Sequence, residues 1–137
     1  MTVEALVFPD TRAALFDLID GTTHLDESVR VVYRLQADEE TGGIKGPFPV
    51  VHVYVTGGTS GYIDRVDRAT IDVYAEGEQA VNVLESISAS ILGSDIETPS
   101  GYLDRIDSDV TPADVPYQSD TLNRATATFL VTSRPIL

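Results

Sequence analysis

The sequence contains no cysteine, and this absence removes several kinds of chemistry at once. Disulfide bonds, thiolate nucleophiles and cysteine-ligated zinc or iron–sulfur centres are all excluded. Histidine is also scarce, because only His24 and His52 are present. A triad needs a nucleophile, a base and an orienting acid in contact, and neither histidine lies in such a pattern. We therefore expect no catalytic residues and no enzyme activity.

Basic residues and long apolar runs are lacking as well. Nine Lys and Arg stand against 22 Asp and Glu, which gives a formal charge of −13. Tight binding to a nucleic-acid backbone needs clustered cations, and no such cluster occurs. No apolar run is long enough to cross a membrane, and the stretch from Met1 to Asp10 has no basic residue, so no signal peptide is expected. The acidic surface either favours solubility or lines a surface to which a polyanion must not adhere.

Two patterns suggest ligand binding, but a simpler interpretation accounts for each. The glycine-rich stretch from Thr56 to Gly61 follows an expected strand, but a phosphate loop also needs a lysine and a following helix, so a hairpin connection is favoured. Calcium binding needs closely spaced oxygen ligands around a glycine. The candidate acids instead alternate with arginine and aliphatic residues, as on solvated strand faces, and they are Asp64, Asp67, Asp104, Asp107 and Asp109. We expect no metal site and no cofactor.

Two helices are expected. The first begins after Phe8-Pro9-Asp10-Thr11, where a proline and polar caps favour a helix start, and it ends at Asp20-Gly21. The second runs from Gln79 to Leu92, because its apolar residues recur at helical spacing, and Gly93 follows as a stop.

Alternating apolar and polar residues predict four strands, at 29–36, 51–56, 69–75 and 124–131. Each segment has one apolar and one mixed polar face, which is typical of a sheet covered on one side. The region 94–121 is rich in loop residues, and only one short strand, near 102–107, is expected within it. The predicted fold class is therefore α+β, with a mostly antiparallel mixed sheet and two helices packed on one of its faces. The length of 137 residues suits one domain.

The chain contains one internal similarity. The segment from Gly61 to Asp67 reads GYIDRVD, and the segment from Gly101 to Asp107 reads GYLDRID. The flanking residues differ, so a repeat fold is rejected. The simplest interpretation is a pair of similar strand edges that lie next to each other.

Charged residues gather on the polar strand faces and in one long connection. Arg30, Arg34, Arg124 and Asp72 fall on the polar faces, where cross-strand ion pairs are favoured over a binding site. The connection from Ala37 to Pro49 is longer than a tight turn, and connections of this length often carry function. Mobility and repulsion between its like charges explain its length and composition equally well.

The order of these elements resembles the tail terminator proteins of long-tailed bacteriophages. The resemblance rests on Phe8-Pro9-Asp10 before the first helix, on the strand PVVHVYV from Pro49 to Val55, and on IDVYA from Ile71 to Ala75 leading into the second helix. The segment from Pro112 to Tyr117 and the closing strand from Asn123 to Arg134 fit as well. The resemblance covers most of the chain, so residues 1–137 are expected to be one tail-terminator-like domain.

Membership of that family implies a structural protein of the virion, made in the host cytoplasm and located in the tail or neck. Such a protein forms a homo-hexameric ring that caps the tail tube, ends its polymerisation and forms the head–tail joining surface. Its expected partners are further copies of itself, the tail tube protein and the head-side connector protein. DNA passes through the ring without specific binding, and no membrane is involved.

Two sets of residues are candidates for assembly. Asp38, Glu39 and Glu40 mark a candidate assembly or lumen loop, expected to be mobile in the isolated protein. Arg30, Arg34 and Arg124 are candidate inter-subunit ion-pair residues. Another phage neck or head–tail completion protein, or a small soluble ligand-binding module, remains as an alternative to the terminator.

Overall fold

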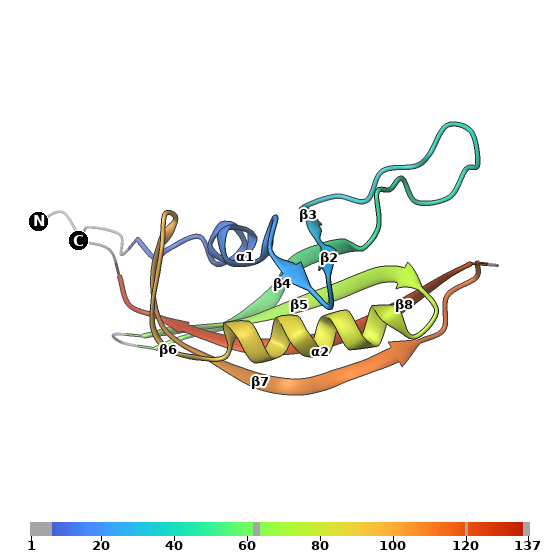
Figure 1. Ribbon diagram of the computed structural model, residues 1–137. Helices are drawn as coiled ribbons and strands as arrows, with labels where there is room; N and C mark the ends of the chain where they lie inside the picture. Colours follow the sequence, from blue (N-terminus) through green and yellow to red (C-terminus); the bar gives the residue numbers. More distant parts are fainter. Residues whose placement is uncertain (1–6, 62–63, 120, 136–137) are drawn as a thin grey trace, which may run out of the picture.

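The computed structural model describes residues 7–61, 64–119 and 121–135, which form two α-helices, a six-stranded sheet and a two-stranded ribbon (Figure 1). The helices are α1 (Thr11–Ile19) and α2 (Gln79–Ile91), and the strands are β1 (Thr23–His24), β2 (Glu27–Ser28), β3 (Arg30–Val32), β4 (Val50–Ser60), β5 (Arg65–Glu76), β6 (Gly93–Thr98), β7 (Gly101–Val115) and β8 (Leu122–Ser133).

The large sheet has the strand order β3-β4-β5-β8-β7-β6. Adjacent strands of this sheet are antiparallel, except for β3 and β4, which run parallel. The predicted α+β class, with a mostly antiparallel mixed sheet, is therefore confirmed. β1 and β2 form the separate ribbon.

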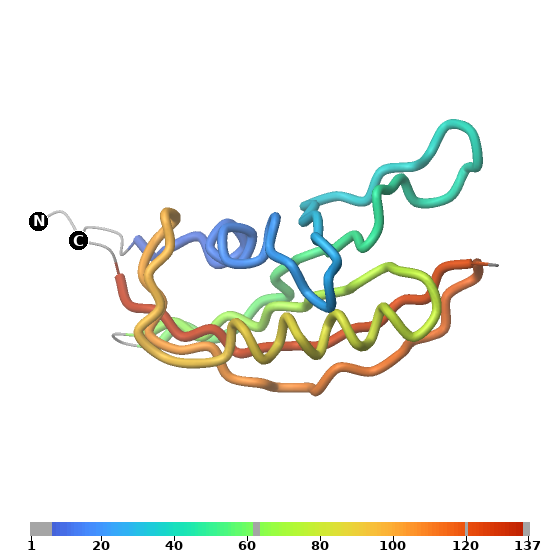
Figure 2. The backbone as a smooth tube through the Cα atoms, in the orientation of Figure 1, coloured from blue at the N-terminus to red at the C-terminus, as the bar shows by residue number. Residues whose placement is uncertain are grey.

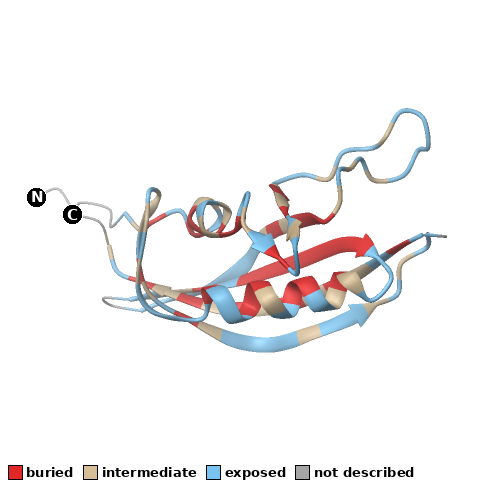
Figure 3. Ribbon diagram, viewed as in Figure 1, coloured by how far each residue is buried: buried red, intermediate tan, exposed pale blue. Residues whose placement is uncertain are grey.

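The centre of the sheet is the pairing of β5 with β8, which runs without a register shift from Arg65 opposite Ser133 to Glu76 opposite Leu122. Alternate residues of both strands point to one face and are fully buried there. That inner face consists of Ala69, Ile71, Val73, Ala75, Ala125, Ala127, Phe129 and Val131. Figure 3 shows the buried stripe along β5 next to α2.

α2 covers this inner face. Gly77, with a φ of 55°, lets the chain turn from β5 into the helix. The apolar side of α2 is buried through Ala80, Val83, Leu84, Ile87 and Ile91. The helix then stops where Leu92 adopts an extended conformation.

α1 packs on the same face at the β3 and β4 end of the sheet. The Asp10 carboxylate accepts a hydrogen bond from the Ala13 N–H at 3.1 Å and caps the start of the helix. At the other end, the Asp20 carboxylate accepts a hydrogen bond from the Val31 N–H at 2.9 Å, which ties α1 to β3. Leu15 and Ile19 bury its apolar side, so both helices lie on one face of the sheet, as predicted.

The strand expected at 29–36 is much shorter than predicted. β3 ends at Val32, and the chain bends away at Tyr33, whose carbonyl accepts a hydrogen bond from His52 Nε2 at 3.2 Å. The Tyr33 ring stacks on Phe16, with centroids 5.1 Å apart, instead of continuing the strand. Because β3 and β4 are parallel, they need a long crossover connection, and the residues between Val32 and Val50 provide it.

The prediction of a loop-rich region at 94–121 was wrong. β6 and β7 fill most of it and meet at a tight turn, Pro99–Ser100. The second half of β7 is largely exposed on both faces, so its sequence shows no apolar alternation. Register shifts at Ser108–Val110 and Val110–Ala113, the latter around Pro112, further obscure the pattern.

The two similar segments do not pair with each other. Arg65–Asp67 and Arg105–Asp107 lie on opposite sides of β8 and both pair with its last residues. Tyr62 and Ile63, which belong to the first segment, lie outside the described residues. β8 therefore separates the two segments that the sequence suggested were neighbours.

Shortening Ile87 to alanine should destabilise the fold by about 2 to 5 kcal/mol, because the side chain is fully buried between α2 and the sheet. Urea unfolding of the wild type and Ile87→Ala measures the difference. Glu85→Ala, on the exposed side of the same helix, is the matched control and should change stability by less than about 0.5 kcal/mol. A loss of that small size for Ile87→Ala would contradict the packing described here.

Candidate functional site

The most prominent surface feature is a hairpin-like arm, residues Ala37–Gly46, which projects away from the domain (Figure 2). Ala37 and Ile44 form an antiparallel bridge, and the Asp38 N–H donates to the Gly43 carbonyl at 2.7 Å. The Asp38 carboxylate accepts a hydrogen bond from the Glu40 N–H at 2.8 Å, which shapes the turn at the tip. Glu39 and Glu40 are exposed. Mobility of the arm in the isolated protein stays a prediction.

Arg30 holds the base of the arm. Its Nη2 donates hydrogen bonds to the carbonyl oxygens of Lys45 at 3.0 Å and Gly46 at 3.1 Å. This candidate for an inter-subunit ion pair therefore has a structural role within its own chain. The contact fixes the direction in which the arm leaves the sheet, and the arm faces the ends of β5 and β8 across an open pocket that Thr41, Glu76 and Leu122 help to line.

Arg34 lies at a different place, just beyond the end of β3. Arg34 is exposed. It follows Tyr33, whose ring contacts both an aromatic ring and a guanidinium group. The Arg12 guanidinium carbon lies 4.4 Å from the centre of the Tyr33 ring, and Phe16 packs against the same ring. Arginine and tyrosine are enriched in protein interfaces, so this corner of the molecule suits a contact with another protein.

Arg124 lies on the outer face of the sheet, opposite the helices, in a cluster with Tyr54, Asp72, Tyr74 and Tyr117. The Tyr54 hydroxyl donates to one Asp72 carboxylate oxygen at 3.3 Å. Burial, followed by the Asp72 charge, raises the pKa of Tyr54. Burial also raises the pKa of Tyr74, and the hydrogen bond with Arg124 opposes that change. Both phenols are therefore neutral hydrogen-bonding groups at physiological pH.

The ion pairs expected on the polar strand faces do not form between Asp72 and Arg124. Oδ1 of Asp72 and Nε of Arg124 are both buried and have no hydrogen-bond partner within the described part of the chain. The three candidate arginines are also far from sharing one site: Arg30 lies at the arm base, Arg34 beyond β3 and Arg124 in β8.

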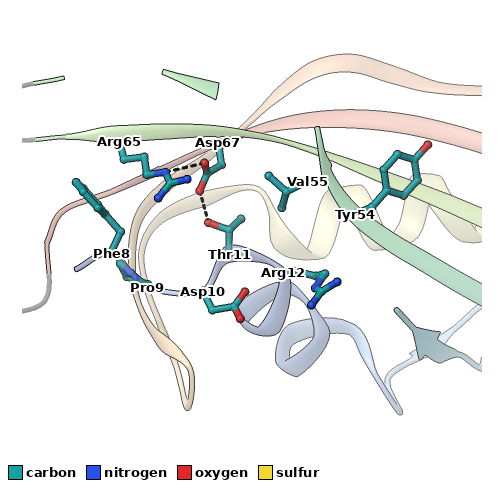
Figure 4. Close-up of a pocket in the computed structure, with 9 residues that line it drawn as sticks. All are labelled: Phe8, Pro9, Asp10, Thr11, Arg12, Tyr54, Val55, Arg65 and Asp67. Atoms are coloured by element: carbon teal, nitrogen blue, oxygen red, sulfur yellow. Dashed lines mark hydrogen bonds and ion pairs between the residues drawn. The ribbon is translucent and has the colours of Figure 1, made fainter. Parts of the chain in front are cut away.

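A pocket of about 460 Å³ lies between the start of α1, the middle of β4 and the start of β5 (Figure 4). The Thr11 hydroxyl donates to Asp67 at 2.7 Å, and Arg65 Nε donates to the other Asp67 oxygen at 3.0 Å. Phe8 lies against the Arg65 guanidinium, whose central carbon is 5.6 Å from the ring centre. The buried carboxylate is thus satisfied on both oxygens, and the contacts fasten α1 to β5.

The aspartates that could suggest a calcium site are divided among separate ion pairs. Asp67 pairs with Arg65, Asp104 with Arg134, Asp107 with Arg105 and Asp109 with Arg68, whereas Asp64 is exposed. In the residues that the structure describes, no three His, Cys, Asp or Glu side chains come together as a metal site.

The expectation that the glycine-rich stretch is a hairpin connection was wrong for most of its length, because Thr56–Ser60 forms the end of β4 and only Gly61 lies beyond the strand. β4 has a register shift between Val55 and Gly58. A side chain at Gly58 would collide with the Val66 carbonyl oxygen of β5, so this glycine allows two strands to approach closely. Within the described ranges no helix has the length and apolar character to span a bilayer.

His24 is a buried polar residue that joins the β1–β2 ribbon to α2. Its Nε2 lies 2.8 Å from the Thr22 hydroxyl, and its Nδ1 lies 2.8 Å from the Ser86 hydroxyl. Thr22 donates its own proton to the Ile19 carbonyl, so it accepts from Nε2, and Nδ1 accepts from Ser86. These contacts suit the neutral ring, and burial lowers the pKa of His24.

The sequence did not reveal the edges of the sheet. β3 covers β4 only from Val50 to His52, so Val53–Ser60 has no strand partner on that side in the described chain. On the other side of the sheet, β6 covers β7 only as far as Ile106, so Asp107–Val115 is likewise unpaired among described residues. We call these two stretches the β4 free edge and the β7 free edge. Finding them required the strand order and register, which no local pattern encodes.

No model of a known protein family matches this chain. No curated protein matches it either.

Acidification should weaken the fold through His24. The unfolded chain takes up a proton at this residue near pH 6.5, whereas the folded chain keeps the ring neutral to a lower pH, so the free energy of unfolding falls as the pH drops below about 6.5. Urea unfolding between pH 7.5 and 5.5 should show a smaller loss for His24→Gln than for the wild type. Parallel curves for the wild type and His24→Gln would contradict this assignment.

Proposed function

We propose that the protein is a structural component of a bacteriophage virion, a tail terminator. Six copies form a ring that caps the tail tube, ends its polymerisation and presents the surface to which the head-side connector binds. The proposal rests on the order and sequence of the elements: a capped first helix, the strand PVVHVYV in β4, the strand IDVYA in β5 leading into α2, and a closing strand in β8.

The structural observation that best supports the proposal is the arm. It extends from the domain, its base is fixed by the two Arg30 hydrogen bonds, and its tip presents Glu39 and Glu40 to solvent. An exposed segment that is held in a defined direction is suited to reach a neighbouring protein. A domain that binds a small ligand would instead need an apolar cavity with converging polar groups.

The distribution of polar groups supports an assembly role. Asp67, the most enclosed acid beside a pocket, is satisfied by Thr11 and Arg65 and so is a structural residue. Several features at the surface of the described chain are available for contacts: the arm, the aromatic and arginine stack at Tyr33, and the two free edges. These are features of a protein that makes contacts with other proteins.

The acidic character of the chain suits a ring through which DNA moves. The formal charge of one chain is −13, and a ring of six would carry six times that charge before neutralisation by counterions. Walls without clustered cations release no counterions from DNA and therefore do not hold it. The same charge opposes ring closure, and it does so more strongly at low ionic strength.

Removing the arm should impair assembly but leave the domain folded. A variant in which Asn-Gly replaces Asp38–Gly43 keeps the Ala37 and Ile44 pair as a two-residue hairpin. Its free energy of unfolding should stay within about 1 kcal/mol of the wild type, because the removed hydrogen bonds are local and exposed.

The matched control for this variant is Glu39→Gln/Glu40→Gln, which keeps the shape of the arm and removes the charge at its tip. Sedimentation and tube-capping assays compare the two variants. If the shortened arm unfolds the domain, the arm is structural and its role in assembly is wrong.

Ring formation should depend on salt. The Debye length falls from about 30 Å at 0.01 M to about 8 Å at 0.15 M ionic strength, so added salt should favour the ring by screening the repulsion between acidic copies. If Arg34 or Arg124 pairs with acids of a neighbour, an intermediate salt concentration should be optimal. Sedimentation velocity over this range, with and without purified tail tubes, measures the effect.

Electron microscopy and DNA binding complete the test. Capped tubes of uniform length should appear when the protein is present during tube polymerisation, and the ring should show no measurable affinity for duplex DNA. Rings that join the connector but ignore tube ends would indicate another neck protein. A compact monomer that never caps tubes, or one that binds DNA with a steep salt dependence, would overturn the proposal.

A further inference from the structure

The two free edges lie at the same level of the sheet. Through the strand register, Val55 of β4 lies opposite Ala69 of β5, Ala69 opposite Phe129 of β8, and Phe129 opposite Ser108 of β7. Val55 and Ser108 are therefore the two ends of one row across four strands, on the same face. The neighbouring row, on the outer face, begins at Tyr54 and ends at Val110.

Exposed apolar side chains mark both ends. Val55 keeps 36% of its surface exposed and Val110 keeps 53%, although most other valines of the large sheet are buried. A strand edge with unpaired backbone groups and exposed β-branched side chains is a template for pairing with another chain. Of the two edges, β4 is the more open, because its free edge contains no charged residue.

The directions of the strands allow the two edges to meet. Along β4, β5, β8 and β7 each neighbour is antiparallel, so β4 and β7 run in opposite directions. When a second copy is placed beside the first in the same orientation, its β7 comes to lie antiparallel to the β4 of the first. This head-to-tail contact uses a different surface on each partner, so it can repeat around an axis and close a ring.

Charge favours this pairing over the alternative contacts. The β7 free edge has no basic residue of its own. It carries Asp114 as well as Asp107 and Asp109, whose charges are offset by Arg105 and Arg68, so two β7 edges would bring acids together without adding a cation. The β4 free edge is uncharged, and Arg12 lines the pocket beside Val55. A β4–β4 pair would join only two copies and would leave both β7 edges open.

We infer that the β4 free edge is a strand-addition site whose partner is the β7 free edge of a second copy, so that neighbouring copies share a continuous antiparallel sheet. The inference rests on the proposed ring and names the surfaces that form it. The register shifts of β7 and its Pro112 limit the shared ladder to a short stretch around Ser108, which restrains uncontrolled association.

Cross-linking tests the contact directly, because the chain has no cysteine of its own. Val55→Cys/Ser108→Cys should form covalent ladders of up to six chains with a short thiol-reactive cross-linker under assembly conditions. Val55→Cys alone should give no ladder, since one cysteine per chain can join only two copies. Leu25→Cys/Ser108→Cys, which uses an exposed residue of the β1–β2 ribbon, is the matched control and should remain uncross-linked.

Charge placement distinguishes the head-to-tail contact from a twofold one. Val55→Asp should raise the concentration needed for half-assembly about tenfold or more, because it adds an acid opposite the acidic β7 edge. Adding Ser108→Lys to the same chain should restore assembly, because each head-to-tail contact then joins Asp to Lys. In a β4–β4 contact two acids would still meet, and no rescue would occur. Leu25→Asp should assemble like the wild type, and thermal unfolding should show that every variant is folded.

The outcomes separate this inference from the proposed function. Rings that form normally with Val55→Asp and give no ladder would place the interface elsewhere and leave the ring intact. Dimers cross-linked through Val55→Cys alone would replace the head-to-tail contact by a twofold one. A chain that stays monomeric at high concentration and on tail tubes would overturn both the ring and the strand addition.

Discussion

The pairing of β5 with β8 is the interaction on which the rest of the structure depends. Twelve residues of each strand are in register, and no bulge interrupts them. The inner face of this pair includes four alanines, Ala69, Ala75, Ala125 and Ala127, and these small side chains leave room for α2 to lie close to the sheet. Phe129 fills the space toward the end where α2 gives way to β6. The pair thus sets the position of α2, and through it the position of β6 and β7.

The length of this central pair also explains why the sheet has free edges. The outer strand pairings are shorter than the central one. β3 pairs with only three residues of β4, and β6 pairs with only the first part of β7. The helices fix the positions of the outer strands. The Asp20 carboxylate at the end of α1 accepts a hydrogen bond from the Val31 N–H of β3, and α2 leads directly into β6. The remaining halves of β4 and β7 extend past this support. A long centre with short flanks therefore produces unpaired edges on opposite sides.

The sequence predicted those features that local patterns determine. Both helices were found, because Asp10, Gly21 and the apolar spacing of α2 are signals within one element. β5 and β8 were found because they alternate and one face is buried. β7 was missed, since its outer half is exposed on both faces and carries no pattern, and β3 was overextended because the alternation continues into Tyr33, which leaves the sheet to pack on Phe16.

The candidate site could be predicted only in part, for a related reason. Asp38, Glu39 and Glu40 marked the acidic loop in the sequence, but its hairpin shape could not be predicted. That shape depends on contacts such as the Arg30 hydrogen bonds, whose partners are distant in the sequence and meet only in the folded chain. The three arginines were grouped because they share a polar strand face, yet β3 and β8 are separated by two strands in the sheet. Residue type and alternation give the face on which a side chain lies, and strand order gives its neighbours.

The acidic charge and the free edges act against each other, and this balance bears on how assembly is controlled. Unpaired strand edges favour association at any encounter, whereas a formal charge of −13 keeps separate copies apart. The electrostatic repulsion between copies acts over a long distance and depends on salt. The attraction between strand edges acts only over a short distance and depends on their geometry. In the proposed ring, a copy that is already held in the correct orientation, by a tube end or by its neighbour, would form the inferred strand contact without overcoming the repulsion of a free encounter. If the proposed ring is controlled in this way, its copies stay apart in solution and the ring closes where a template aligns them.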